Sequence, residues 1–460
     1  MNGDGRADFF LGGGNGQAST LYVQRPDGSF VERSQSAFAD HRASNDVDAL
    51  LFDYDGDDDP DLYVASGGYW GVSEGNAALQ DRLYVNDGSG TFTAAPDALP
   101  RMRTSTGTVA ATDLDDNGRP DLFVGGRVAP GRYPEPPRSY VLMNRENGGF
   151  ADRTDRMAPG LRSIGMVTDA LWHDLDGAGS KELVVAGEWM PISVFGRNGE
   201  MLRERTDDYF NRPHRGYWHS VRLLRLGGRI GLLAGNLGQN TQLRATAEEP
   251  VELFHDDVDG DGRPDPILSY YLNGTRYPHP LLDRLRSAVP SLGGRFSSYE
   301  DYANATLSDL LTVSERKTAN RLTVDQLKTS LFVMGPNGRL EQRPLPVQAQ
   351  FAPVFAAQPL DYNEDGHTDL LLAGNMNETR VRFAKYDANY GVLLRGGGSG
   401  GFDYVPQHRS GFALRGDVRA IEKVGERLLV GMNRDSLAAY RPSTRPPVPA
   451  PGVRAQRTDR

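Results

Sequence analysis

The chain repeats one pattern of hydrophobic and polar positions along most of its length. A short apolar segment such as DALLF or TVAAT leads into an acidic turn, and a second apolar segment such as DLYVASGG or DLFVGGR follows it. After a variable loop comes a third piece with a Gly, Asn or Asp turn, for example LYVNDGSGTF or VLMNRENGGF, which predicts a hairpin. The repeated unit is therefore strand, acidic turn, strand and outer hairpin.

Units of this kind, returning about every 40–60 residues, are typical of propeller blades. The sequence predicts an all-β fold, a single β-propeller of about seven blades, each a four-stranded antiparallel sheet. We place the blades near residues 1–40, 46–100, 108–160, 167–210, 219–345, 354–410 and 417–442. The propeller then occupies 1–442, with a small helical insertion at 275–326 in the fifth blade. The proline-rich tail, 443–460, is expected to be disordered.

The acidic turns share the nine-residue frame D-x-[D/N]-x-[D/N]-[G/D]-x-x-D. Full copies begin at Asp53, Asp113, Asp257 and Asp361, and their candidate metal ligands are Asp53, Asp55, Asp57, Asp61, Asp113, Asp115, Asn117, Asp121, Asp257, Asp259, Asp261, Asp265, Asp361, Asn363, Asp365 and Asp369. A copy that matches only from the third position of the frame supplies Asn2, Asp4 and Asp8. A weaker copy supplies Asp174, Asp176 and Glu182, with Ala178 at its central position.

Calcium fits these frames because it takes six to eight oxygen ligands, which alternating residues of a tight turn can aim inward. Glycine at position 6 supplies the positive φ that the turn needs, and Asp58 at this position is tolerable because Asp visits that region. An EF-hand is excluded because its position 12 must be Glu, and here that position holds Val64, Val124, Leu268 and Leu372. Solvated turn acids are the alternative. Magnesium and zinc fit less well, so we expect four to five structural calcium sites.

Composition limits the partners. The formal net charge is −10, with 61 Asp and Glu against 51 Lys and Arg, which argues against nucleic acid as a partner. There is no cysteine, so disulfides are excluded. No apolar run is long enough to span a membrane, and the start lacks the layout of a signal peptide. Because the chain starts inside a frame, we interpret the N-terminus as truncated.

The frames and the hairpins ending in Phe, such as DGSF, GSGTF and NGGF, resemble FG-GAP/VCBS repeat proteins, whose best-known members are the integrin α-subunit propellers. The motifs GGR, PGRYPEPPRSY and GNLGQNTQL are also similar to large bacterial VCBS proteins related to the ASPIC/UnbV group. The resemblance covers the chain to about residue 440. It implies a calcium-binding propeller that is extracellular, periplasmic or on the cell surface, often with an adhesion or recognition role.

A ligand site is expected on the face opposite the acidic turns, where the loops after the second strands are rich in polar and aromatic residues. The candidates are Tyr69, Trp70, Arg127, Arg132, Tyr133, Trp189, Asn236, Asn375 and Arg380. Packing between blades is the alternative role for each of them.

The function predicted from these features is a non-catalytic binding or adhesion module for a glycan or protein ligand. The alternatives are a propeller-fold glycosidase or lyase and a scaffold subunit of a surface complex. No G-x-S-x-G, H-E-x-x-H or P-loop motif is present in the sequence.

Overall fold

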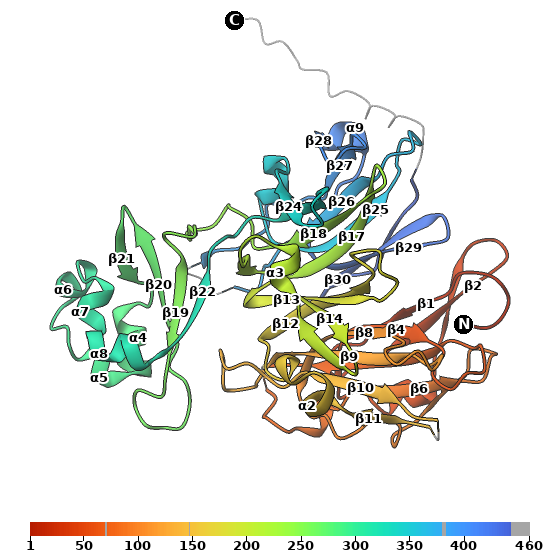
Figure 1. Ribbon diagram of the computed structural model, residues 1–460, viewed down its shortest axis with the longest axis horizontal. Helices are drawn as coiled ribbons and strands as arrows, with labels where there is room; N and C mark the ends of the chain where they lie inside the picture. The colour runs from red at the N-terminus through yellow and green to blue at the C-terminus, as the bar shows by residue number, and fades with distance from the viewer. Residues whose placement is uncertain (70, 147, 380–382, 443–460) are drawn as a thin grey trace, which may run out of the picture.

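The computed structural model describes residues 1–69, 71–146, 148–379 and 383–442. Over these residues the strands form eight antiparallel sheets, and seven of them follow one another along the chain as blades (Figure 1). Five of the seven have a four-stranded path in chain order, whereas the first and the last have three strands each. The predicted all-β propeller is confirmed. The predicted tail, 443–460, lies outside the described residues.

The strands of the blades have the following bounds. The first three blades contain β1 (Phe9–Leu11), β2 (Thr20–Gln24) and β3 (Phe30–Arg33); β4 (Asn45–Phe52), β5 (Asp61–Gly67), β6 (Arg82–Asn86) and β7 (Phe92–Ala94); and β8 (Ser105–Thr112), β9 (Asp121–Val128), β10 (Tyr140–Asn144) and β11 (Phe150–Asp152). The fourth blade contains β12 (Met166–His173), β13 (Glu182–Pro191), β14 (Ser193–Asn198) and β15 (Met201–Glu204), and β16 (Arg215–Tyr217) pairs with β13. The last three contain β17 (Ser220–Leu226), β18 (Arg229–Gly235), β23 (Ser330–Met334) and β24 (Leu340–Arg343); β25 (Val354–Leu360), β26 (Asp369–Gly374), β27 (Val392–Gly396) and β28 (Phe402–Val405); and β29 (Asp417–Val424), β30 (Arg427–Asn433) and β31 (Ala438–Tyr440).

The connections between blade strands contain only short helices. These are α1 (Ser36–Ala39), η1 (Ala77–Leu79), α2 (Thr154–Met157), η2 (Pro159–Leu161), α3 (Thr206–Tyr209), η3 (Val347–Gln350) and α9 (Gln407–Ser410).

The hydrophobic core lies between successive blades. Six clusters of buried side chains each combine residues of two neighbouring blades, from the first and second to the sixth and seventh. The second strand of a blade is packed on both faces, so every residue of β5 and of β26 is buried. This explains why these strands read as continuous apolar runs without alternation.

The first strands of neighbouring blades lie side by side, with β4 next to β8, β8 next to β12, β12 next to β17, β17 next to β25 and β25 next to β29. The last blade also approaches the first, because the Arg427 guanidinium lies 6.0 Å from the centre of the Phe30 ring. The blades therefore follow one another around a ring.

The recurring glycine at the end of the second strand is required by the close approach of the next blade. A Cβ on Gly235 would lie 2.2 Å from the backbone oxygen of Val354 in the sixth blade. Real Cβ atoms do not approach backbone that closely, so the motif LAGN needs its glycine.

Two half-buried aspartates join first strands of adjacent blades. Asp48 on β4 accepts hydrogen bonds from the Val109 backbone N–H and the Thr108 hydroxyl, both at 2.9 Å, on β8. Asp169 on β12 accepts the Val221 N–H of β17 at 2.8 Å. Each aspartate follows a bulge in its own strand, which turns its side chain toward the neighbour.

The insertion in the fifth blade is larger than the predicted 275–326 and is not purely helical. The chain leaves the blade after β18 and returns at β23. In between, it forms a separate four-stranded sheet, ordered β21-β20-β19-β22, which projects from the side of the propeller in Figure 1. Its strands and helices are β19 (Val251–His255), β20 (Ile267–Leu272), β21 (Thr275–Pro278), α4 (Leu282–Ala288), α5 (Pro290–Gly293), α6 (Tyr299–Ala303), α7 (Leu307–Leu310), α8 (Val313–Thr318) and β22 (Asn320–Val324).

This arrangement moves the acidic frame 257–265 out of the propeller. The frame connects β19 and β20 of the inserted sheet, whereas the fifth blade joins β17 to β18 by a plain turn without acids. Local sequence does not distinguish this frame from a frame in a blade, because both have the order strand, acidic turn and strand.

The buried Asp81 predicts a pH dependence of stability. Its carboxylate accepts hydrogen bonds from the Ser66 N–H and the Tyr63 hydroxyl, both at 2.7 Å, and from the Thr106 hydroxyl of the next blade. Burial nevertheless raises the pKa of Asp81 from 3.8 to about 7. Between these values the folded chain keeps a proton that the unfolded chain releases, so Asp81 makes the free energy of unfolding fall as pH rises across that window.

Asp81→Asn cannot titrate, so we expect it to flatten this fall when denaturant unfolding is measured at several pH values. The exposed Asp97→Asn is the control and should keep the slope of the parent protein. Equal slopes for the Asp81 variant and the parent would contradict the assignment.

Candidate metal centres

The acidic frames all occupy tight turns between two antiparallel strands. Four lie in blades, between β4 and β5, β8 and β9, β12 and β13, and β25 and β26, and one lies between β19 and β20 of the insertion. The copy at residues 2–8 precedes β1. The predicted placement of the frames between two strands is therefore confirmed for every complete copy.

The first carboxylate of the frame closes the turn. Asp53 accepts the Gly56 N–H with one oxygen, at 2.7 Å, and the Asp58 N–H with the other, at 3.2 Å. Corresponding pairs of bonds occur in the turns that begin at Asp113, Asp174, Asp257 and Asp361. These turns are therefore held by hydrogen bonds within the protein alone.

Two positions of the frame need a left-handed backbone. Position 6 was predicted to do so, and Asp58 has φ 69° there. The sequence analysis missed position 4, where Asp116 has φ 61° and Glu364 has φ 59°. Glycine is the usual solution at both positions because it has no Cβ. The signal was present in the sequence, since Gly56 and Gly260 occupy position 4 in two other copies.

The ninth residue is a buried carboxylate that joins the turn to the third strand. Asp61 is 0% exposed, and its two oxygens accept the N–H groups of Tyr54, in the turn, and Asn86, on β6, each at 2.8 Å. The equivalent acid makes the same two kinds of bond in the third and sixth blades. Asp121 accepts the N–H groups of Leu114 and Asn144, and Asp369 accepts those of Tyr362 and Gly396.

An asparagine at the end of the third strand extends this link to the preceding blade. The Asn144 amide donates to the backbone oxygen of Tyr54, at 2.9 Å, in the acidic turn of the second blade. The Gly149 N–H donates to the Tyr54 hydroxyl. The endings LYVN and VLMN of the third strands carried this signal, but the sequence analysis read them only as strand residues.

Burial of these acids is electrostatically unfavourable without a cation. Burial raises the pKa of Asp61 to about 6, and repulsion from Asp55 and Asp57 adds to the effect. The pKa of Asp121 is raised to about 6 for the same reasons, with Asp115 and Asp113 as its neighbours. A bound cation would offset both the burial and the repulsion.

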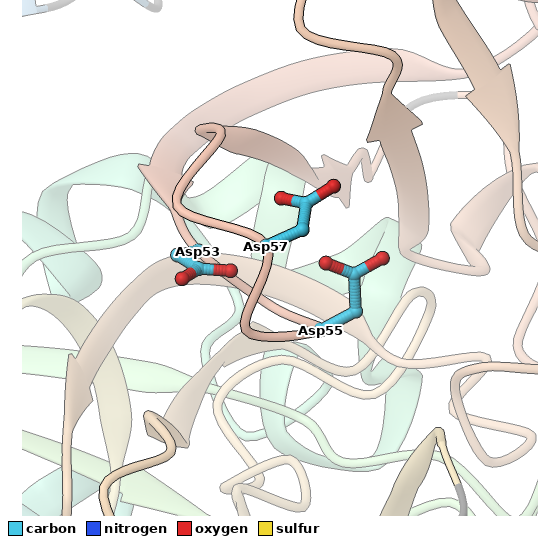
Figure 2. A group of neighbouring side chains, drawn as sticks. All are labelled: Asp53, Asp55 and Asp57. Carbon is cyan, nitrogen blue, oxygen red and sulfur yellow. The ribbon is translucent and has the colours of Figure 1, made fainter.

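Four groups of acids have ligand atoms close enough together to hold one metal ion. Within each group the atoms lie within 4.8 Å of one another, and the groups are Asp53, Asp55 and Asp57; Asp113, Asp115 and Asp121; Asp174, Asp176 and Glu182; and Asp257, Asp259 and Asp265. Figure 2 shows the first group, with its three carboxylates projecting from one turn. The amide Asn117 and the acid Asp261 occupy position 5 of their turns and accept the N–H of position 7, each at 2.8 Å.

In the fourth blade, the guanidinium of Arg205 supplies a positive charge at the turn 174–182, which the sequence analysis described as the weaker copy of the frame. One nitrogen of the Arg205 guanidinium lies 2.9 Å from a Glu182 oxygen and 3.2 Å from an Asp176 oxygen. The Asp208 carboxylate lies 2.9 Å from the same guanidinium. The arginine supplies the positive charge that a metal ion would bring, so this group is a protein ion-pair cluster.

The copies at 2–8 and 361–369 are not among the groups with three converging acids in the described residues. In both, the asparagine at position 3 turns its amide nitrogen toward the acid at position 5, with Asn2 2.9 Å from Asp4 and Asn363 2.8 Å from Asp365. Arg6 also pairs with Asp4 at 2.5 Å. Of the remaining predicted ligands, Asp8 lies 3.3 Å from the N-terminal nitrogen.

Residues predicted to form a ligand face mostly pack inside the protein. Trp189 is 5% exposed and donates to the Tyr133 hydroxyl at 2.7 Å. Asn236 and Asn375 are buried, and their amide groups donate to the backbone oxygens of Gln326 and Asn389. These four side chains fill contacts within the chain.

The remaining predicted face residues are more accessible. Arg127 pairs with Glu188 at 2.6 Å, and Tyr69 is partly exposed. Arg132 forms two bonds to Glu135 and donates to the backbone oxygen of Gly262, at 3.0 Å, in the acidic turn of the insertion. Trp70 and Arg380 lie outside the described residues.

The insertion covers part of the predicted face. One buried cluster combines Trp189 of the fourth blade and Tyr386 of the sixth with Val251, Leu253 and Val324 of the inserted sheet. The Phe383 ring stacks on His279 of the insertion at 4.8 Å. The sequence analysis did not predict the contact between Phe383 and His279, because these residues lie more than a hundred positions apart in the chain.

The topology and the turns together define a β-propeller built from repeats with acidic turns. A family model described as an FG-GAP-like repeat matches residues 1–64 and 65–124. The FG-GAP-like repeats predicted from the motifs are therefore confirmed over this part of the chain.

Two further comparisons add little. No curated protein matches the sequence. The crystal structure of BBS1N in complex with ARL6DN, soaked with lead, is similar over 93% of this chain and 88% of that chain, with 9% identity and a TM-score of 0.36. A TM-score of this size carries no argument about fold or function.

The arginine in the fourth blade can be tested directly. Arg205→Ala leaves the buried Glu182 without its cation, so we expect a loss of about 1–3 kcal/mol in the free energy of unfolding. Because the turn then resembles the other acidic groups, added calcium should recover part of the loss. Chemical denaturation with and without calcium measures both effects, with the exposed Arg203→Ala as the control. A loss that calcium does not change would contradict the view that Arg205 substitutes for a metal ion.

Proposed function

We propose that this protein is a calcium-stabilised binding module that recognises a glycan or protein ligand outside the cytoplasm. The observation that carries the calcium part is the buried ninth carboxylate, which lies beside two or three further acids in a turn that is already formed. The best-supported sites are the turns at 53–61 and 113–121 in the propeller and at 257–265 in the insertion.

The donor set favours calcium over the other common metals. The four acidic groups contain carboxylates only, with no histidine and no cysteine, whereas zinc prefers nitrogen and sulfur ligands. The frames at 53–61 and 257–265 also contain Asp61 and Asp261, which lie outside the groups of three acids, and this number of oxygens suits the six to eight ligands of calcium. The metal would brace the turn against the third strand, because both meet at the ninth carboxylate.

Calcium removal is the direct test. EDTA should lower the melting temperature, and calcium should restore it, because an ion that binds only the folded chain stabilises it by mass action. Elemental analysis of the dialysed protein should find several calcium ions per chain. Asp55→Ala should remove one of them, whereas Asp59→Ala in the same turn, at a position that offers no side-chain ligand, should remove none. A melting temperature that EDTA leaves unchanged, with no calcium found, would refute the proposal.

The binding part of the proposal is supported by the FG-GAP repeats, because β-propellers of this kind serve as binding or protein-interaction modules. The proposed location is extracellular, periplasmic or on the cell surface, because calcium sites occur in extracellular modules. None of the described helices is long and apolar enough to cross a membrane.

We further propose that the module is not an enzyme, since most of its clustered acids serve the turns. A panel of polysaccharides separates this proposal from a propeller-fold glycosidase or lyase. We expect saturable binding to a member of the panel without the release of reducing ends or unsaturated products. Turnover that persists after repurification, and that is proportional to protein concentration, would favour the enzyme instead.

A further inference from the structure

The first strands of five blades share one irregularity near their starts. In each of them a β-bulge leaves one residue out of the ladder with the second strand, and these residues are Val47, Gly107, Thr168, Phe355 and Arg419. Bulges re-aim side chains and are frequent next to binding sites. Because the first strands lie side by side around the ring, the bulges surround the central axis on the face opposite the acidic turns.

Three further residues lie at the same level. The fifth blade has a regular ladder, and His219 immediately precedes its first strand. Arg127 and Glu188 come from the second strands of the third and fourth blades. We call these three residues and the five bulge residues the axial rim.

Side chains of different blades contact one another at the axial rim. The His219 ring stacks on the Phe355 ring with 4.1 Å between the centroids, and the Arg419 guanidinium lies 4.0 Å from the centre of the Phe355 ring. Two groups this close to one ring must lie on its opposite faces, so Phe355 is held between the fifth and seventh blades. In the third and fourth blades, Arg127 pairs with Glu188 at 2.6 Å.

His219 has hydrogen-bonding capacity that the protein does not use. The residue is 8% exposed, and its Nε2 atom is buried without a hydrogen-bond partner in the described part of the chain. Burial lowers the pKa of His219 to about 4, so the ring is neutral near pH 7, and the charges of Glu188, Arg127 and Arg419 all act on it. Buried polar atoms normally have a partner, so this nitrogen is available to a ligand hydroxyl, directly or through a water.

Arg419 is a cation whose charge is only partly compensated. One guanidinium nitrogen donates to the backbone oxygens of Asn375 and Val418, at 3.1 and 2.8 Å. The Asp417 carboxylate lies 3.9 Å from the guanidinium, too far for a hydrogen bond, and accepts the N–H and the amide of Asn377 instead. The Arg419 side chain is 30% exposed, so its remaining N–H groups can meet an anion from outside.

We propose that the axial rim binds an acidic saccharide, with the carboxylate of a uronic acid at Arg419 and sugar hydroxyls at His219 and at the Arg127–Glu188 pair. A hydroxyl both donates and accepts, which suits a neutral imidazole and a guanidinium beside a carboxylate. An acidic peptide side chain would use Arg419 and leave the other groups without a partner. This inference rests on the proposed binding function and names the ligand class, and it does not depend on the metal turns.

Acidic oligosaccharides and their carboxyl-reduced forms isolate the contribution of the carboxylate. Oligosaccharides of hyaluronan, alginate and pectate are titrated calorimetrically into the full chain at one fixed free calcium concentration, each beside its reduced, neutral form. At least one acidic oligosaccharide should bind saturably. Its reduced form should bind about tenfold more weakly, because the charge-assisted hydrogen bonds of Arg419 are lost.

The results distinguish this inference from the proposed function. Equal affinity for an acidic oligosaccharide and its reduced form would overturn the inference, and so would binding to neutral saccharides alone or to polyglutamate alone. In these cases the binding function stands. If the acidic oligosaccharides do not bind, the inference fails, whereas the proposed function fails only if the neutral saccharides and polyglutamate do not bind either.

Two variants locate the site. Arg419→Gln should weaken the acidic form about tenfold and leave the reduced form unchanged, whereas Arg395→Gln, at an exposed position of β27, should change neither. His219→Phe keeps a ring against Phe355 but removes the Nε2 atom, so it should weaken both forms alike. Melting curves of each variant check that it folds. Unchanged affinity for the acidic form in a folded Arg419→Gln protein would also overturn the proposal.

Discussion

The carboxylate at the ninth position of each frame is the interaction on which the blades depend. A buried acid needs hydrogen-bond partners, because an unpaired polar group in a core is costly. Asp61 meets this demand by accepting one N–H from its own turn and one from the third strand. The turn and the strand are thereby fixed relative to each other. In the third blade, Asp121 makes the same two bonds, and the third strand of that blade also contacts the preceding blade through the Asn144 amide, which donates to the Tyr54 backbone oxygen.

The charge of that carboxylate still requires compensation, and the chain uses more than one solution. In the second blade Asp53, Asp55 and Asp57 converge on the turn, and in the third blade Asp113 and Asp115 converge with the ninth carboxylate, Asp121. Both groups create a place for a divalent cation. In the fourth, Arg205 supplies the charge from within the protein. In the sixth, Asn363 replaces one acid and turns its amide toward Asp365. The loss of ligands at a frame is therefore coupled to the gain of an internal donor, and the turn keeps its shape in each case.

The sequence predicted what depends on local pattern. The frames, the strands beside them and the outer hairpins repeat within short segments, so their existence and approximate number could be read from the chain. The Asp48 and Asp169 links between blades were not predicted, although DAL occurs in both first strands, because their partners are backbone groups about fifty to sixty residues away. The frame at 257–265 was assigned to the wrong sheet for the same reason, since only the long-range pairing of β19 with β22 separates it from a blade.

The insertion packs against residues that the sequence analysis assigned to a ligand face. Trp189 and Tyr133, two of the aromatic residues predicted for that face, pack in one cluster with the inserted sheet. Arg132 adds a polar contact by binding the backbone oxygen of Gly262 within the acidic turn of the insertion. Because Glu135 holds Arg132 in two bonds, the guanidinium is oriented before it meets this oxygen. The face thus recognises a part of its own chain, and a turn first read as part of a blade serves to anchor the insertion against the third.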